Sequence, residues 1–195
     1  MKKLISLSLA LLLCFSMVFA MSSCASKHPL EEFAQKIEKT KSYQMVITMS
    51  DIPIFGTMSI TTKVDGNIQY TPEVLMSPEQ YIETVGDIRY VYAKGEDGNW
   101  TKAQEEVEKD SSDLDDFEEM KDFFNPENFE AVEGKEKTFK QKKDVTFDDF
   151  SEVVVTLTDD GCTLETKATS EGMVMSVKIE ISHIGEIELT LPEVK

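Results

Sequence analysis

The sequence has 195 residues and a formal net charge of −17, from 37 acidic and 20 basic side chains. A surface of this sign repels phosphate backbones and anionic headgroups, so it argues against a nucleic-acid partner and against a membrane contact based on charge. The length suits a single domain that buries a hydrophobic core of its own.

The first 24 residues have the pattern of an export signal with a processing site. A basic Lys2-Lys3 start precedes an almost wholly apolar run over residues 4–20, and Met21-Ser22-Ser23 leads to Cys24. The apolar run is short for the ~20 residues that a membrane-spanning helix needs, which disfavours an uncleaved anchor. A signal peptide without a lipid is the other alternative, and it leaves Cys24 without a role.

At these residues the chain resembles bacterial lipoproteins, whose lipobox places an apolar residue and two small residues before a cysteine. Met21 is a tolerated rather than a preferred first member of that box. The resemblance implies removal of residues 1–23 and attachment of a diacylglyceryl group to Cys24. Two acyl chains are enough for stable anchoring, since each buried methylene contributes about 0.8 kcal/mol. We therefore expect that acyl chains anchor the protein in the cell membrane and that it faces the extracellular or periplasmic side. Residues 24–28 would be the lipidated cysteine and its tether.

An amphipathic helix is expected directly after this tether. Pro29 suits the first turn of a helix. Apolar residues then recur at helical spacing, namely Leu30, Phe33, Ala34 and Ile37. Charged side chains occupy most other positions, so one face can pack on a core. We expect this helix to end near Lys41 or Ser42.

From Tyr43 onward apolar residues alternate with polar ones, as in half-buried strands. Asp65-Gly66-Asn67 marks a hairpin, in which a three-residue loop that pairs Val64 with Ile68 keeps the apolar side chains on one face. The next hairpin has a two-residue loop at Gly86-Asp87, which pairs Val85 with Ile88. Two later hairpins are expected, at residues 153–166 around Asp159-Asp160-Gly161 and at residues 173–191 around His183-Ile184-Gly185.

A second helix is expected between the earlier and the later hairpins. Ser112 can cap it, and it ends before Asn125-Pro126. Its rough apolar stripe consists of Leu114, Phe117, Met120, Phe123 and Phe124. The acidic residues of this region lack the order of a calcium-binding loop, so we interpret them as a solvated helix face rather than a metal site.

The order of these elements predicts an α+β fold for residues 29–195, taken as one domain. We expect about nine strands in a single curved antiparallel sheet, a half-open barrel, with the N-terminal helix and the second helix packed on its concave face. Two helices cover only part of such a sheet. The uncovered part of the apolar face would then form a cleft.

This arrangement resembles the LolA-like lipoprotein-carrier superfamily and its lipid-binding relatives of the LppX and LprG kind. The resemblance is carried by the helix at residues 29–41, the strand at 43–49, the hairpin at 65–67, the strand at 90–92 running on to Trp100, and a closing strand at 187–192. It implies a half-open barrel whose concave side is plugged by helices over an apolar cavity. The superfamily also includes periplasmic sensors, and none of its ligand residues can be assigned to a position here.

Motifs of catalysis and cofactor binding are absent from the sequence. There is no Gly-x-Ser-x-Gly elbow, no His-Glu-x-x-His motif, no zinc-spaced cysteine pair and no glycine-rich phosphate loop. We interpret His28 and His183 as solvated residues, and Cys162 as a small buried hydrophobe rather than a nucleophile. We therefore expect neither an enzyme nor a bound cofactor or metal.

Methionine is the strongest functional signal, because its flexible, polarizable side chain adapts to varied apolar partners, although core packing explains the same positions equally well. The residues expected to line an apolar cavity are Met45, Met49, Met58, Ile60, Tyr90, Tyr92, Phe117, Met173, Met175 and Val177. The sequence thus predicts a non-catalytic lipoprotein that binds a lipid or another apolar ligand between sheet and helices, for carriage across the cell envelope. The alternative is an envelope sensor or interaction module with a protein partner and no transported ligand.

Overall fold

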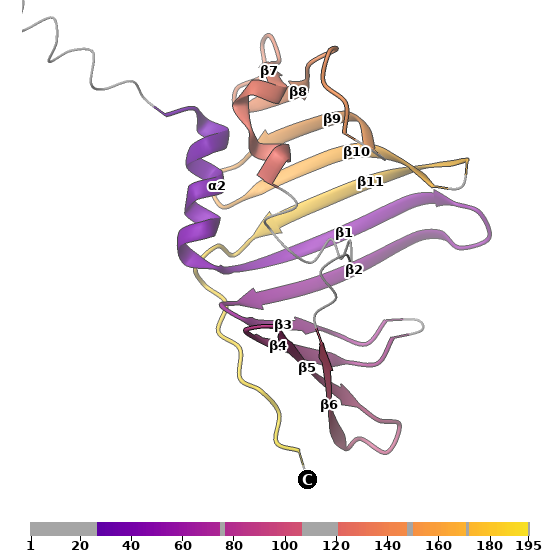
Figure 1. Ribbon diagram of the computed structural model, residues 1–195. Coiled ribbons are helices and arrows are strands. Elements are labelled where there is room, and N and C mark those ends of the chain that lie inside the picture. The colour runs from indigo at the N-terminus through magenta and orange to yellow at the C-terminus, as the bar shows by residue number, and fades with distance from the viewer. Residues whose placement is uncertain (1–26, 75–76, 107–120, 148–149, 171, 195) are drawn as a thin grey trace, which may run out of the picture.

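The computed structural model describes residues 27–74, 77–106, 121–147, 150–170 and 172–194. These ranges form one antiparallel sheet with the strand order β6-β5-β4-β3-β2-β1-β11-β10-β9-β8-β7 (Figure 1). The order is linear and the sheet is not closed, so β6 and β7 form its two edges. The strands are β1 (Ser42–Ile52), β2 (Gly56–Asp65), β3 (Ile68–Thr71), β4 (Gln80–Val85), β5 (Ile88–Lys94), β6 (Trp100–Glu106), β7 (Phe129–Ala131), β8 (Thr138–Gln141), β9 (Phe150–Leu157), β10 (Cys162–Ser170) and β11 (Met173–Ser182).

The chain enters this sheet through helix α2 (Pro29–Thr40), which confirms the expected N-terminal helix. His28 caps the helix, since its Nδ1 accepts a hydrogen bond from the Leu30 N–H at 3.2 Å, and its ring centroid lies 5.0 Å from that of Phe139. This capping role replaces the solvated one expected from the sequence. The helix ends at Lys41, whose left-handed backbone (φ 50°) turns the chain into β1.

Strand β1 lies at the centre of the sheet although it is the first strand in the chain. It pairs with β2 on one side and with β11, the last strand, on the other (Figure 1). Tyr43 and Met45 of β1 are buried on one face, and Met45 lies opposite Ile181 of β11. The pairing of β1 with β11 therefore joins two runs of consecutive antiparallel strands, β1–β6 and β7–β11, into one sheet.

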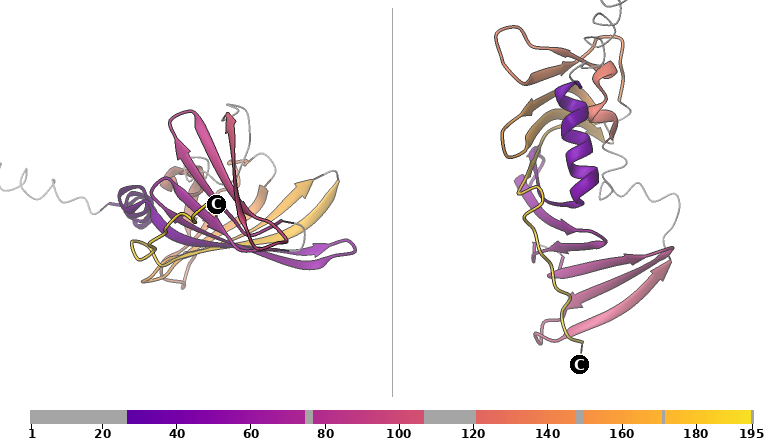
Figure 2. Two further views of the ribbon diagram at one scale, coloured as in Figure 1. Left: turned by 90° about the horizontal axis from the view of Figure 1, so that it is seen from below. Right: turned by 90° about the vertical axis from the view of Figure 1, so that its left-hand side faces the viewer.

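The core lies chiefly on one face of the β7–β11 half of the sheet, under α2 and the 3-10 helix η1 (Lys121–Phe124) (Figure 2). Phe33 of α2 and Phe124 of η1 pack with their ring centroids 5.1 Å apart. Strand β9 contributes Val153 and Val155 to the same cluster, both 0% exposed. Burial of apolar surface is the main favourable term in folding, so this half of the sheet supplies much of the stability.

The predicted α+β fold with a second helix on the concave face is wrong. Among the described residues α2 is the single α-helix, and strands make up most of the remainder. Residues 112–120 of the expected helix lie outside the described ranges, and its last residues form the short 3-10 helix η1, followed by the 3-10 helix η2 (Pro126–Asn128). Asn125 between the two 3-10 helices is extended, because Pro126 disfavours helical geometry in the residue before it.

The β2–β3 hairpin has a register other than the expected one. Its loop is Gly66-Asn67, with Lys63 opposite Tyr70, so the predicted three-residue loop is wrong. Gly66 adopts the positive φ (62°) of the tight turn, and its N–H donates to the Lys41 carbonyl at 2.7 Å. A shift of one residue moves side chains to the other face of a sheet. Tyr70 consequently lies on the face of Lys63, away from the core.

Two other hairpins confirm the sequence prediction, and the last one contradicts it. Val85 pairs with Ile88 across the two-residue loop of β4 and β5, and Leu157 pairs with Cys162 between β9 and β10. Residues 187–191, however, form no strand beside β11. Both sides of β11 are already paired, with β1 and with β10, so the sheet leaves no position for a returning strand there.

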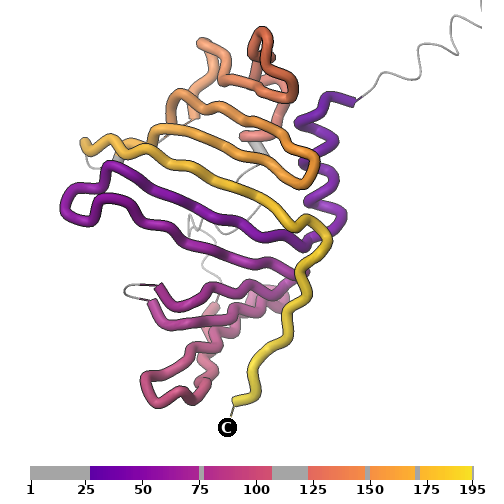
Figure 3. The backbone as a smooth tube through the Cα atoms, turned by 180° about the vertical axis from the view of Figure 1, so that it is seen from behind, coloured from indigo at the N-terminus to yellow at the C-terminus, as the bar shows by residue number. Residues whose placement is uncertain are grey.

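The segment after β11, residues 183–194, instead crosses the sheet on the face opposite α2 (Figure 3). Ser42 Oγ donates to the Ile187 carbonyl at 2.9 Å and lies 3.0 Å from the Ile187 N–H, and the Leu189 N–H donates to the Asp65 carboxylate at 3.0 Å. Ser42 and Asp65 are cross-strand partners of β1 and β2. The segment is therefore fixed across the first two strands rather than added to the sheet.

Candidate functional site

The apolar face of the sheet continues beyond the core along β1, β2 and β11. We call this continuation the apolar strip and define it by Ile47, Met49, Met58, Ile60, Met175 and Val177. The register places Met49 between Met58 and Val177. Val177 is buried and the other five side chains are half-buried, whereas Met45, nearer the start of β1, is only 2% exposed. The strip is thus an apolar surface that runs from the core toward the far ends of β1 and β11.

The structure brings six of the ten expected cavity residues together. Five of them belong to the strip, and Met45 lies at its core end. Met173, at the start of β11, is 42% exposed beyond the other end of the strip. Tyr90 and Tyr92 lie on the opposite face of the sheet, and Phe117 lies outside the described residues. That the gathered residues contact a ligand stays a prediction.

Tyr90 and Tyr92 belong to an aromatic cluster on the other face of β3–β6, together with Tyr70, Tyr81 and Trp100. The centroids of the Tyr70 and Tyr81 rings are 4.7 Å apart, and those of Tyr81 and Trp100 are 5.5 Å apart. Lys102 Nζ lies 4.0 Å from the Tyr90 ring centroid and 4.8 Å from that of Tyr92, which favours a cation–π contact. The side chains lie on this face because of the register of the β2–β3 hairpin, which differs from the predicted one.

Carboxylates accept hydrogen bonds from two hydroxyl groups of this cluster, those of Tyr70 and Tyr92. The Tyr70 O–H donates to Glu79 at 3.1 Å, and Lys94 pairs with the same carboxylate at 2.8 Å. The hydrogen bond from Lys94 lowers the pKa of Glu79, while burial and the bond to Glu79 raise the pKa of Tyr70. Near neutral pH the carboxylate is therefore ionised and the phenol is protonated. Because these groups bond to one another, we interpret the cluster as part of the structure of the sheet and not as a ligand site.

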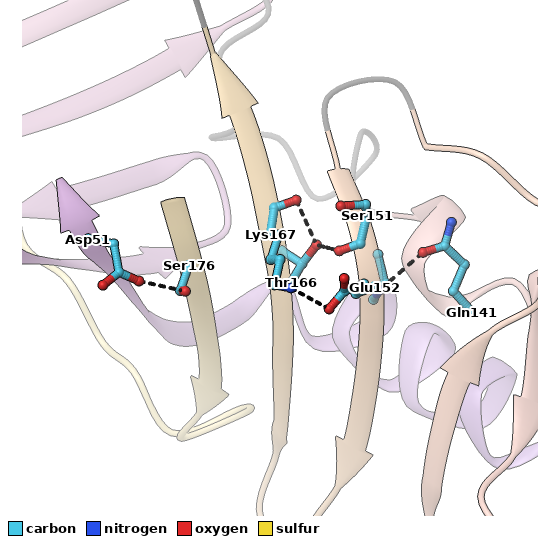
Figure 4. Close-up of polar contacts among 8 residues, drawn as sticks. Asp51, Gln141, Ser151, Glu152, Thr166, Lys167 and Ser176 are labelled. Atoms are coloured by element: carbon cyan, nitrogen blue, oxygen red, sulfur yellow. Dashed lines mark hydrogen bonds and ion pairs between the residues drawn. The ribbon is translucent and has the colours of Figure 1, made fainter. Parts of the chain in front are cut away.

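The face opposite the strip carries polar side chains near the β-bulge between β9 and β10 (Figure 4). Lys167 Nζ lies 2.8 Å from the Glu152 carboxylate, and Ser176 Oγ donates to the Asp51 carboxylate at 2.8 Å. An open depression of about 390 Å³ lies over these strands and is lined by side chains of both charges. In the described ranges no group of three or more His, Cys, Asp or Glu side chains could hold a metal ion.

Neither Cys162 nor His183 has the surroundings of a catalytic residue. Cys162 is 3% exposed, and burial raises the pKa of its thiol to about 12, so the thiol is protonated at neutral pH. This confirms the expected packing role of Cys162. His183 is exposed in the turn after β11, where its Nδ1 lies 3.2 Å from Glu186. Its exposure agrees with the solvated position expected from the sequence.

Two neighbouring hairpin tips, which sequence reasoning missed, expose apolar side chains next to the strip. We define these hairpin tips by Ile54 and Phe55 of the β1–β2 turn and by Met173 and Val174 at the start of β11. They lie at the same end of the sheet because β1 pairs with β11 (Figure 1). The signal was present in the sequence, since Ile52-Pro53-Ile54-Phe55 places apolar residues where turns are usually polar.

The site is therefore an open apolar strip that ends at exposed hairpin tips. Its six side chains include no titratable group, so it can hold a molecule by apolar contact and exclusion of water. None of the helices in the described part of the chain is long and apolar enough to span a bilayer. A search with protein-family models finds no family that matches the chain, and a search of curated proteins finds no significant match.

Proposed function

We propose that this protein binds an acyl chain or another apolar ligand along the apolar strip, as a lipid-anchored protein of the bacterial cell envelope. The proposal is carried by the strip itself, in which five of six apolar side chains are only half-buried on an open sheet face. Each Å² of apolar surface that a ligand removes from water contributes about 25 cal/mol. Met49, Met58 and Met175 are flexible enough to follow ligands of different shape.

A relation to the LolA-like lipoprotein carriers is part of this proposal. Its support is the order of the elements, in which an N-terminal helix at the ends of the strands precedes one open antiparallel sheet with an apolar face. A ligand on the strip would extend the core toward the hairpin tips, along β1 and β11.

The membrane anchor in this proposal is Cys24, which lies outside the described residues. Full-length protein from a bacterial host should enter the detergent-rich phase in a detergent phase separation. Cys24→Ala should abolish the incorporation of a radiolabelled fatty acid into the protein during growth, because the thiol that carries the acyl chains is lost. Cys14→Ala is the matched control, since Cys14 lies within the apolar run of the signal, and it should leave the partition and the labelling unchanged. Fatty-acid labelling that survives Cys24→Ala would contradict the anchor.

Ligand binding can be tested with a soluble form that starts at Ala25. After incubation with a long-chain fatty acid, native mass spectrometry should show a near-stoichiometric adduct. Met58→Glu places a carboxylate in the strip and should weaken this uptake by at least about tenfold, because an unpaired charge is costly to bury. Organic extraction of protein purified from cells would then identify any lipid that it carries.

Ser59→Glu is the matched control for this experiment. Ser59 follows Met58 in β2, is exposed, and lies on the other face of the sheet. The control adds the same charge and should leave uptake unchanged, while thermal unfolding of both variants verifies that each is folded. Equal uptake by Met58→Glu and the wild type would contradict the strip as the ligand site. A wild type without uptake would favour the alternative of an envelope interaction module.

A further inference from the structure

The hairpin tips form the most exposed large apolar surface in the described part of the chain. Ile54 is 100% exposed, and Phe55, Val174 and Met173 are 61%, 58% and 42% exposed. Ile54 also has a φ of 75°, a conformation in which a β-branched side chain is strained. An apolar side chain that a strained turn holds in water adds nothing to the stability of the isolated fold. A binding role explains both features together.

We propose that the two hairpin tips insert into a lipid bilayer, so that the protein has a membrane contact in addition to its anchor. Charge points to this partner, because residues 52–62 and 172–177 hold no charged side chain in a chain of which 29% of residues are charged, and Glu171 is the one charged residue in the sequence between β10 and β11. Asp51, at the base of the first tip, is bonded to Ser176 on the polar face of the sheet. The largely apolar projection that results matches the hydrocarbon region of a bilayer.

The shape of the tips points to the same partner. A protein partner would need a pocket fitted around each projecting turn, whereas acyl chains rearrange around an inserted side chain. The apolar strip begins directly behind the tips, since Met175 follows Met173 on the same face of β11. An acyl chain that leaves the bilayer at the tips would reach the strip without crossing a charged surface. This route for the ligand rests on the proposed function, whereas the bilayer contact does not.

The hairpin tips and helix α2 lie at opposite ends of the strands. Helix α2, which follows the tether, lies at the start of β1, and the first tip lies at the end of β1 (Figure 1). An anchored molecule therefore brings the tips to its own bilayer when the strands lie along the membrane surface. The soluble form that starts at Ala25 has no such restriction, so it is the form to test.

The test is flotation of this soluble form with vesicles of zwitterionic phosphatidylcholine. The wild type should float with the vesicles. Ile54→Ser with Phe55→Ser, and separately Met173→Ser with Val174→Ser, should each lower the partition coefficient by at least about tenfold, because two large apolar side chains are lost from the contact. Val85→Ser is the matched control, since Val85 is 52% exposed at the end of β4, and it should leave binding unchanged.

Tryptophan fluorescence distinguishes insertion from adhesion at the surface. The chain has one tryptophan, Trp100, so Trp100→Phe combined with Phe55→Trp places the single tryptophan on a tip. With vesicles, its emission should shift to the blue and be quenched by lipids that are brominated on their acyl chains. The combination of Trp100→Phe with Val85→Trp should show neither effect.

Several results would overturn the proposal. They are a wild type that does not float, a loss of binding in Val85→Ser equal to that of the tip variants, or a tryptophan at position 55 that stays in water. Tip-dependent dimers without vesicle binding, seen by analytical ultracentrifugation, would assign the tips to a second copy and overturn it too.

The proposals of ligand uptake and of bilayer contact can be contradicted independently of each other. The tip variants should still take up fatty acid from solution, and Met58→Glu should still float. A wild type that floats but takes up no fatty acid would contradict the proposed function alone.

Discussion

Gly161→Ala should lower the free energy of unfolding by about 3 kcal/mol or more, the upper range for overpacking a filled site. Gly161 is buried in the turn before β10, and a Cβ atom there would overlap the carbonyl oxygen of Ile181 in β11 and come within 2.9 Å of its carbonyl carbon. These are backbone atoms of a paired strand, so they cannot rotate away as the end of a side chain can. Urea unfolding followed by circular dichroism measures the change.

Gly98→Ala separates this close approach from the general effect of replacing a glycine. Gly98 has a positive φ of 78° with open space around its Cα, so the alanine variant there should cost about 1 kcal/mol through backbone strain alone. If Gly161→Ala costs no more than Gly98→Ala, the close contact between the β9–β10 turn and β11 is not present in solution.

Phe124→Ala should lower the free energy of unfolding by about 3–5 kcal/mol, as expected for removing a large ring from a filled core. Phe124 is 2% exposed, and its ring packs against Phe33, so the change leaves a cavity between η1 and α2. Thermal and urea unfolding measure the loss. Phe55→Ala, which removes the same ring from a side chain that is 61% exposed, should change stability by less than about 0.5 kcal/mol.

A double-mutant cycle tests the contact between the two rings directly. Phe33→Ala and Phe124→Ala should show a coupling energy of about 0.5–1.5 kcal/mol, the range for packed aromatic pairs. Additive effects would mean that η1 is not docked on α2, although each ring could still be buried elsewhere. The cycle therefore measures whether the 3-10 helix covers the core where the structure places it.

The parts of the fold that could be predicted from the sequence depend on neighbouring residues. Pro29 and the apolar spacing after it identified α2, and Gly86-Asp87 identified the β4–β5 hairpin with its register. In both cases the signal and the contact lie within a few residues of each other. The pairing of β1 with β11 joins residues far apart in the chain, and alternation of apolar and polar residues does not say which strands are neighbours.

The restriction of sequence patterns to local contacts also explains which residues of the candidate site were predicted correctly. Met49, Met58 and Met175 could be placed on one apolar face because alternation within a strand is a local property. Tyr90 was placed on the wrong face because its position depends on the loop of the preceding β2–β3 hairpin, where a shift of one residue reverses the faces of the strands paired beyond it, β3–β6. The hairpin tips were missed because the alternation of apolar and polar residues identifies strands and gives no information about the turns between them.

The central position of β1 has a consequence for the order in which this protein can mature. A ribosome releases β1 long before β11, so one side of β1, with Met45, has no native neighbour until Ile181 has been synthesised. An unpaired apolar strand edge invites association between chains, and closing so long a loop slows folding. The complete sheet of this design cannot form until almost its last strand is available, and such a delay suits the transport of an unfolded polypeptide through a membrane channel.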